Sequence, residues 1–288
     1  MQDNSSHSKA LVLGGGGVAG IAWATGILLG LEEGGVDLRS ANLVIGTSAG
    51  AAVGGQFTSD VPLSDLLDRQ VDPTRQVGEM RPNIKYGRII AGVLAALLVR
   101  KDTQRFRIRI GAMARAAKTV DPAVRRDIIA QRLPRHEWPE MGLTVAAIDA
   151  SSGEQRWFDA QSGVSLVDAV AASCAVPGVW PLVPIGGRLY YDGGLPSADN
   201  AHRASGYGAV LILSPVGRSR SGGLRKGLRS EISALEREGS RVTVLTLDAE
   251  ARAAIGRNVL DPSTRPAAAR AGLDQGRRAV PEVLTGWG

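Results

Sequence analysis

The sequence has few of the residues that form disulfides, aromatic cores or membrane spans. It contains one cysteine, Cys174, so an intrachain disulfide is excluded, which fits a reducing compartment. The longest apolar run, residues 89–99, is shorter than the ~20 residues that a membrane-spanning helix needs. Residues 1–8 are polar and have no apolar signal-peptide core. We therefore expect a flexible tail at 1–8 and a cytoplasmic protein, with peripheral membrane attachment left open.

The charge and composition of the chain limit the classes of partner that it is expected to bind. Lys and Arg outnumber Asp and Glu by 34 to 28, which gives a formal net charge of +6. The basic residues lie in short patches, at 105–109, 125–126, 218–229 and 277–278, and none is a long run interleaved with aromatic residues. We therefore expect no nucleic-acid partner, whereas weak attraction to anionic membranes stays open. Hydrophobic residues make up 44% of the 288, enough for a full core without a metal or a disulfide.

The first sixty residues alternate between strand and helix patterns. Short apolar runs at 9–13 and 43–46 predict buried strands, and the spacing of apolar residues predicts helices at 21–33 and 49–57. This order is typical of a parallel sheet covered by helices. It predicts an α/β fold with a mostly parallel central sheet and helices on both faces.

The rest of the chain predicts a helical insertion and a second group of sheet elements. Residues 61–140 contain helical stretches broken by prolines and no convincing strand, so we expect a helical insertion or cap there. Beyond it we predict strands at 143–150, 155–159, 209–214 and 241–247, short extended pieces within 182–191, and helices at 165–173, 225–238, 249–258 and 263–278. We interpret residues 1–288 as a single domain, and the sequence does not indicate an oligomeric state.

A candidate nucleophile lies between the second strand and the second helix. Residues 46–50 fit the pattern G-x-S-x-G, with Ser48 at the centre and Gly46 and Gly50 on either side. A serine on such a sharp strand-to-helix turn is held in an exposed, strained position, and the glycines let neighbouring backbone approach. The alternative is an ordinary serine at a helix N-cap.

A glycine loop follows the first strand and opens the first helix. The backbone amides of residues 14–17 have no partner within the helix, so they can converge on the oxyanion of an acyl-transfer intermediate. A merely tight turn is one alternative. Another is the dinucleotide fingerprint G-x-G-x-x-G, which Gly15, Gly17 and Gly20 satisfy. That fingerprint expects an acid at the end of the second strand, and Asp37 lies before the strand instead.

Histidine, the usual base for a serine nucleophile, is scarce. Of the three histidines, His7 lies in the polar tail and His136 in the irregular helical region. In α/β-hydrolases the serine is followed along the chain by an acid and then by a histidine. His202 follows Asp192 and so fits that order, but it lies at the head of a predicted helix. We expect all three at the surface.

Asp192 is the better candidate for the base. It follows an extended stretch, and Gly193 and Gly194 let the backbone bend sharply beside it. A carboxylate in a partly desolvated pocket has a raised pKa and is a better base. The alternative is a plain Asp-Gly hairpin turn.

Together, four blocks of the sequence resemble the patatin-like phospholipase family. They are residues 14–20, 46–50, 172–181 and 192–194, in that family's order. The resemblance implies a three-layer fold and a dyad of Ser48 and Asp192 without histidine. It implies an oxyanion hole built from the amides of Gly15, Gly16 and Gly17. It also implies that residues 172–181, which contain Cys174 as a small buried residue, pack beside the dyad, and that Asn200 is a polar position the family often keeps.

The implied activity is hydrolysis of lipid carboxylic esters, as a phospholipase, a lysophospholipase or an esterase, without a cofactor or metal. One departure stands out, because the family usually carries Arg or Lys two residues after the glycines, where this chain has Val18 and Ala19. A catalytically weak or inactive lipid-binding protein is therefore one alternative, and a dinucleotide-binding oxidoreductase is another. The apolar run at 89–99 has basic ends, so both a membrane-touching lid and a buried helix stay open.

Overall fold

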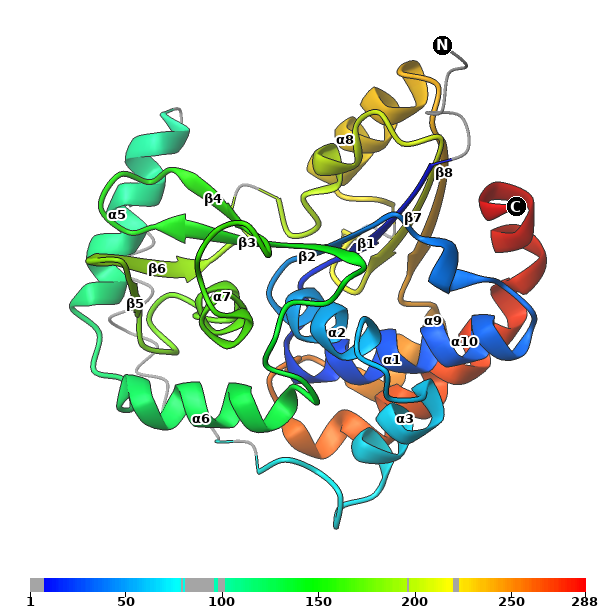
Figure 1. The fold of residues 1–288 in the computed structure, drawn as a ribbon, viewed down its shortest axis with the longest axis horizontal. Helices are drawn as coiled ribbons and strands as arrows, with labels where there is room; N and C mark the ends of the chain where they lie inside the picture. The colour runs from blue at the N-terminus through cyan, green and yellow to red at the C-terminus, as the bar shows by residue number, and fades with distance from the viewer. Residues whose placement is uncertain (1–7, 79, 81–95, 98–101, 196, 220–222) are drawn as a thin grey trace.

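A mostly parallel sheet forms the centre of the protein (Figure 1). The structure, a computed structural model, describes residues 8–78, 80, 96–97, 102–195, 197–219 and 223–288. Its strands are β1 (Lys9–Leu13), β2 (Leu43–Gly46), β3 (Gly142–Asp149), β4 (Gln155–Phe158), β5 (Val183–Ile185), β6 (Arg188–Asp192), β7 (Ala209–Ser214) and β8 (Arg241–Thr246). Their order across the sheet is β5-β6-β3-β2-β1-β7-β8, and β4 pairs with β3.

The sheet has a parallel core and an antiparallel edge. Strands β3, β2, β1, β7 and β8 pair in parallel, whereas β4, β5 and β6 join through antiparallel pairs. The helices are α1 (Gly17–Glu33), α2 (Ala49–Phe57), α3 (Leu63–Val71), α5 (Thr103–Arg115), α6 (Pro122–Arg132), α7 (Leu166–Ser173), α8 (Lys226–Arg237), α9 (Ala249–Ile255) and α10 (Arg265–Trp287). Short 3-10 helices form η2 (Leu38–Ser40), η3 (Ala201–Ala204) and η4 (Pro262–Thr264).

Both faces of the sheet are covered by helices. Alternate residues of β1 point to opposite faces, because side chains alternate along a strand. Ala10 and Val12 pack with residues of η3 and α8, whereas Leu11 and Leu13 pack with α1, α2, α7 and α10. The predicted α/β fold, with a mostly parallel sheet and helices on both faces, is confirmed.

The helical stretch at 61–140 contributes to the layer of helices that covers the sheet. Its described residues form α3, α5 and α6 and contain no strand. Ile110 and Ala114 of α5 pack on Ile148 of β3 and Tyr191 of β6, so α5 is a layer of the fold rather than a separate cap. The apolar run at 89–99 lies outside the described residues except for 96–97, and the tail at 1–8 does so except for residue 8.

The helix boundaries that differ most from the sequence prediction are the start of α1 and the end of α10. Helix α1 begins at Gly17, within the glycine loop, and not at residue 21. Helix α10 continues through Pro281 to Trp287, although the prediction ended it at 278. Burial explains the extension, because Val283 and Trp287 are buried and the indole of Trp287 donates to the carbonyl of Asp37 at 2.9 Å. None of the described helices combines the length and the apolar character needed to cross a bilayer.

Helices α1 and α10 touch through their backbones. A Cβ on Gly276 would lie 2.6 Å from the carbonyl oxygen of Ile27, and one on Gly30 would lie 2.8 Å from the amide nitrogen of Arg277. Such distances leave no room for a side chain. This contact holds the second half of α1, the helix that begins in the glycine loop, against α10.

The substitution Gly276→Ala tests this packing. The added methyl group cannot fit without moving a helix, so the free energy of unfolding should fall by about 1–3 kcal/mol in urea titrations. Gly227→Ala in α8 is the matched control, because nothing lies within 4 Å of that position. It should leave the stability unchanged or raise it by up to about 1 kcal/mol. Equal effects of the two substitutions would contradict the packing argument.

Candidate active site

Ser48 lies on a strained turn between β2 and α2. Its backbone has φ 54° and ψ −117°, a region that residues with a side chain rarely adopt and that costs roughly 1–3 kcal/mol. Close packing imposes this turn, because a Cβ on Gly46 would lie 2.6 Å from Cα of Ala51, and one on Gly50 would collide with the carbonyl of Leu13. The two glycines therefore bring β1, β2 and α2 together beneath the serine.

The segment at 172–181 holds this turn from the other side. The amide of Ser48 donates to the hydroxyl of Ser173 at 2.8 Å, and the thiol of Cys174 donates to the carbonyl of Ser48 at 3.1 Å. Cys174 is buried, so it acts here as a small packing residue. The sequence did not single out Ser173, and only its place next to Cys174 in the block could have suggested it.

Asp192 meets Ser48 at the end of β6. The hydroxyl of Ser48 donates to Oδ2 of Asp192 at 2.6 Å, and the amide of Gly194 donates to Oδ1 at 2.8 Å. A Cβ on Gly193 would collide with the carbonyl of Ala146, so the bend after Asp192 needs glycine there. The structure thus brings together the predicted nucleophile and the predicted base.

Burial makes Asp192 more basic than an ordinary aspartate. Its carboxylate is almost fully buried, which raises its pKa from 3.8 to about 6. The hydrogen bonds from Ser48 and Gly194 act in the opposite direction, because they stabilise the charged form. The pKa of the carboxylate therefore lies closer to neutral pH, which makes Asp192 a better proton acceptor than an ordinary aspartate.

The predicted donors of the glycine loop differ in what they contact. The amide of Gly15 donates to the carbonyl of Ala198 at 2.8 Å. Gly15 lies next to the nucleophile, because a Cβ there would be in ordinary van der Waals contact with Cβ of Ser48, at 3.5 Å. Among the described residues, the amides of Gly16 and Gly17 have no backbone acceptor, so they are the candidates that stay.

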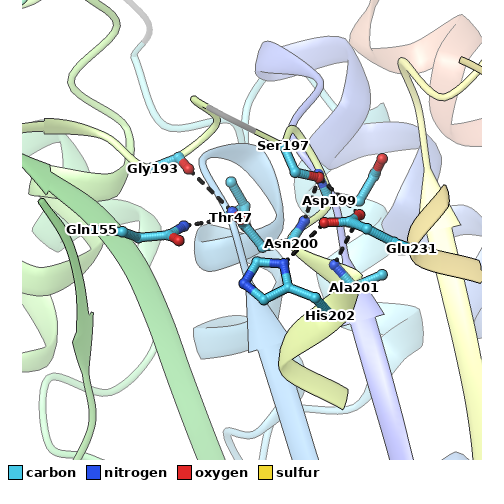
Figure 2. Close-up of polar contacts among 9 residues, drawn as sticks. All are labelled: Thr47, Gln155, Gly193, Ser197, Asp199, Asn200, Ala201, His202 and Glu231. Carbon is cyan, nitrogen blue, oxygen red and sulfur yellow. Dashed lines mark hydrogen bonds and ion pairs between the residues drawn. The ribbon is translucent and has the colours of Figure 1, made fainter. Parts of the chain in front are cut away.

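Asn200 joins the two turns that carry the serine and the aspartate (Figure 2). Its Nδ2 donates to the hydroxyl of Thr47 at 2.9 Å and to the carbonyl of Gly193 at 3.1 Å. Its Oδ1 accepts from Nε2 of Gln155 at 2.7 Å. Asn200 is fully buried, and its backbone lies in the left-handed region with φ 54°. The hydrogen bonds of its side chain form a clamp between the two turns. The sequence marked Asn200 only through the family resemblance, and it did not mark Gln155.

His202 belongs to a neighbouring network and not to the dyad. Its Nδ1 lies 2.9 Å from Oε1 of Glu231, whose Oε2 accepts from the hydroxyl of Ser197 at 2.9 Å (Figure 2). Asp199 is buried beside this network, and burial raises its pKa to about 6. It packs against Gly14, where a Cβ would collide with its carboxylate. His202 and His136 are exposed, as expected, and His7 lies outside the described residues.

A narrow cavity opens beside Ser48. Its apolar lining comes from Val18, Ile21, Val176, Trp180 and Leu260, and its charged lining comes from two arginines of α6. The described residues contain no group of three or more His, Cys, Asp or Glu side chains that could hold a metal. The site therefore offers a serine, a buried carboxylate, backbone amides and an apolar wall with positive charge.

Comparison with protein families identifies this arrangement. Residues 11–204, more than half of the chain, match the patatin-like phospholipase family. The chain belongs to the patatin-like phospholipase family. The matched range includes the glycine loop, so that loop is the glycine block of a patatin-like phospholipase and not a dinucleotide fingerprint.

Relatives of this patatin-like chain occur in mycobacteria. Uncharacterized NTE family proteins of Mycobacterium bovis and Mycobacterium tuberculosis are 31% identical to it over 199 residues. The match covers 68% of this chain and 45% of theirs, so the chain spans about half the length of the curated relatives it matches. Two solved structures are distantly similar. VipD from Legionella pneumophila has a TM-score of 0.46 and 13% identity over 96% of this chain and 67% of that chain. The type III effector protein ExoU has a TM-score of 0.40 and 16% identity over 96% and 53%.

Asn200→Asp tests the clamp between the two turns. The substitution keeps the shape but replaces both donors at Nδ2 with an acceptor, so it should repel the carbonyl of Gly193 and shift the two turns apart. A misplacement of the reacting groups by about 1 Å costs up to ~100-fold in rate. We expect labelling of Ser48 by a fluorophosphonate to slow about 10- to 100-fold.

Gln155→Ala is the graded comparison for this clamp, because it removes only the partner of Oδ1 and should have a smaller effect. Labelling rates are compared on folded protein by mass spectrometry. An Asn200→Asp variant that labels at the original rate would contradict the role of the clamp.

Proposed function

We propose that this chain is a serine acyl hydrolase that cleaves carboxylic esters of lipids through a Ser48–Asp192 dyad. The observation that carries the proposal is the 2.6 Å hydrogen bond from the Ser48 hydroxyl to a buried carboxylate, on a turn with φ 54°. Membership in the patatin-like phospholipase family supports a lipid ester as the substrate class.

The first half of the reaction forms an acyl-enzyme. Asp192 accepts the hydroxyl proton as Oγ of Ser48 attacks the ester carbonyl, and the carbonyl electrons move to oxygen. The amides of Gly16 and Gly17 donate to this oxyanion, and the N-terminus of α2 favours negative charge beside Ser48. As the intermediate collapses, the bond to the alcohol breaks, and Asp192 returns its proton to that alcohol.

The second half repeats these steps with water. Asp192 accepts a proton from water, whose oxygen attacks the acyl carbonyl and forms a second tetrahedral intermediate. Collapse releases the fatty acid, and the proton on Asp192 returns to Oγ of Ser48. The raised pKa of Asp192, about 6, supports both transfers, because an ordinary aspartate holds a proton too weakly near neutral pH.

A catalytically weak lipid-binding protein is the second candidate. Ala19 occupies the position where the family usually has a cation, and the amide of Gly15 is engaged with Ala198. Both observations remove groups that would stabilise an oxyanion. In either function we propose that the chain meets its lipid at a membrane surface, as a cytoplasmic protein without a resident cofactor.

Ser48→Ala and Asp192→Asn separate the two candidates. Each removes one half of the dyad, so esterase activity on a p-nitrophenyl ester should fall by at least ~1,000-fold. Ser162→Ala, at an exposed serine, is the matched control and should retain full activity. Wild-type protein should carry the fluorophosphonate on Ser48. Absence of wild-type labelling and turnover in folded protein would favour the lipid-binding candidate.

The pH profile tests Asp192 as the base. Because burial raises its pKa to about 6, the protonated and inactive form dominates below that pH. We expect kcat/KM to rise about tenfold per pH unit below 6 and to level off above it.

Asp199 shares the raised pKa, so Asp199→Asn is the control for this profile. This variant should keep the acid limb and its midpoint. If Asp199→Asn abolished the acid limb of the profile, that limb would report the titration of Asp199 and not of Asp192.

A further inference from the structure

Helix α8 carries a carboxylate on its inward face. Its buried residues Leu228, Ile232 and Leu235 form an apolar stripe, and Glu231 completes the spacing i, i+3, i+4, i+7 of that stripe. The side chain of Glu231 is only 14% exposed. A carboxylate is rarely placed in this way unless hydrogen-bonding partners offset the cost of removing it from water. Glu231 also lies beyond residues 11–204, so the family match does not account for it.

Glu231 holds the segment at 197–202 against α8 (Figure 2). Its Oε2 accepts from the hydroxyl of Ser197 at 2.9 Å and from the amide of Ala201 at 3.3 Å. Its Oε1 lies 2.9 Å from Nδ1 of His202. One carboxylate therefore fixes both the beginning and the end of this segment.

The hydroxyl of Ser197 also shapes the turn that follows it. Its oxygen accepts from the amides of Asp199 at 3.3 Å and of Asn200 at 2.9 Å, while the hydroxyl donates to Glu231. Asn200 is the N-cap residue of η3, yet its side chain makes no capping hydrogen bond. Because the amide of Ala201 donates to Glu231 instead, the side chain of Asn200 is left for other contacts.

This turn contacts three parts of the candidate site. The carbonyl of Ala198 accepts from the amide of Gly15 in the glycine loop at 2.8 Å. Nδ2 of Asn200 donates to the hydroxyl of Thr47 in the nucleophile turn and to the carbonyl of Gly193 in the base turn. The glycine loop, the nucleophile and the base are therefore aligned by one turn, which α8 holds through Glu231.

We propose that Glu231 is a positioning residue, which sets the geometry of the nucleophile and the oxyanion donors through Ser197 and Ala201. The wall of the cavity beside Ser48 comes from other segments, including Trp180 and Leu260. Glu231 should therefore matter when the oxyanion forms, and much less when the ester binds to that wall. This inference rests on the proposed function and adds a residue to its machinery.

Glu231→Ala and Glu231→Gln test this role. The alanine variant removes every contact of the carboxylate, so kcat for a p-nitrophenyl ester should fall about tenfold, while KM should stay within about twofold. Fluorophosphonate labelling of Ser48 should slow by the same factor. Glutamine can accept from Ser197 through its carbonyl oxygen and can donate to Nδ1 of His202, so it should restore kcat to within about threefold of the wild type.

Glu238→Ala is the matched control, because it also removes a carboxylate that links α8 to η3. Oε2 of Glu238 accepts from the hydroxyl of Ser205 at 2.7 Å, at the end of η3 away from the dyad turns. This variant should keep the wild-type kcat.

Ser197→Ala removes only a hydroxyl and should also slow labelling. Its effect combined with that of Glu231→Ala should be smaller than the product of the two single effects, because both substitutions break one shared contact.

Urea titrations separate positioning from a merely structural role, which would lower the free energy of unfolding and leave the labelling rate of folded protein unchanged. A folded Glu231→Ala protein with the wild-type kcat and labelling rate would overturn the positioning role and leave the hydrolase intact. An equal loss in Glu238→Ala, or a glutamine variant as slow as the alanine variant, would do the same. Absence of wild-type labelling and of turnover would instead overturn the proposed function, and the positioning role with it.

Discussion

The rest of the candidate site depends on the short hydrogen bond between Ser48 and Asp192, which lie 144 positions apart in the chain. Strand β3 makes the meeting of Ser48 and Asp192 geometrically necessary. Gly46, just before the serine, pairs with Val145 on one side of β3, and Asp192 pairs with Ala147 on the other. Because β2 runs parallel and β6 antiparallel to β3, the two strands end at nearly the same height. The antiparallel edge of the sheet is thus the part that completes the site.

The polar groups around this bond divide into those that hold it and those that face the cavity. Ser173, Cys174 and Asn200 each bind backbone or side-chain atoms of the turns, so they fix geometry, and Cys174 also lines the cavity. The arginines of α6 line the same cavity. A low-dielectric site strengthens both kinds of interaction, because water competes less for each partner. Burial therefore explains the raised basicity of Asp192.

Local patterns predicted much of the fold. The bounds of β1, α2 and β7 matched the sequence prediction, because short apolar runs and glycine turns specify such elements without distant partners. The dyad needed the family resemblance, since no local pattern says which aspartate meets Ser48. Contacts between distant residues escaped both approaches. The bond from Gly15 to Ala198 and the burial of Arg125 depend on how separate segments pack, and the sequence showed Arg125 only as part of a basic patch.

The backbone contact between α1 and α10 has a consequence for the newborn chain. Gly276 packs on Ile27, and the indole of Trp23 donates to Gln275 at 2.9 Å, so the helix that starts in the glycine loop is held by residues that follow it by about 250 positions. Ribosomes add ~5–20 residues per second, so roughly ten seconds or more separate synthesis of Ser48 from that of its distant support. The packing of α1 on α10 can therefore form only after the chain has been translated through residue 276.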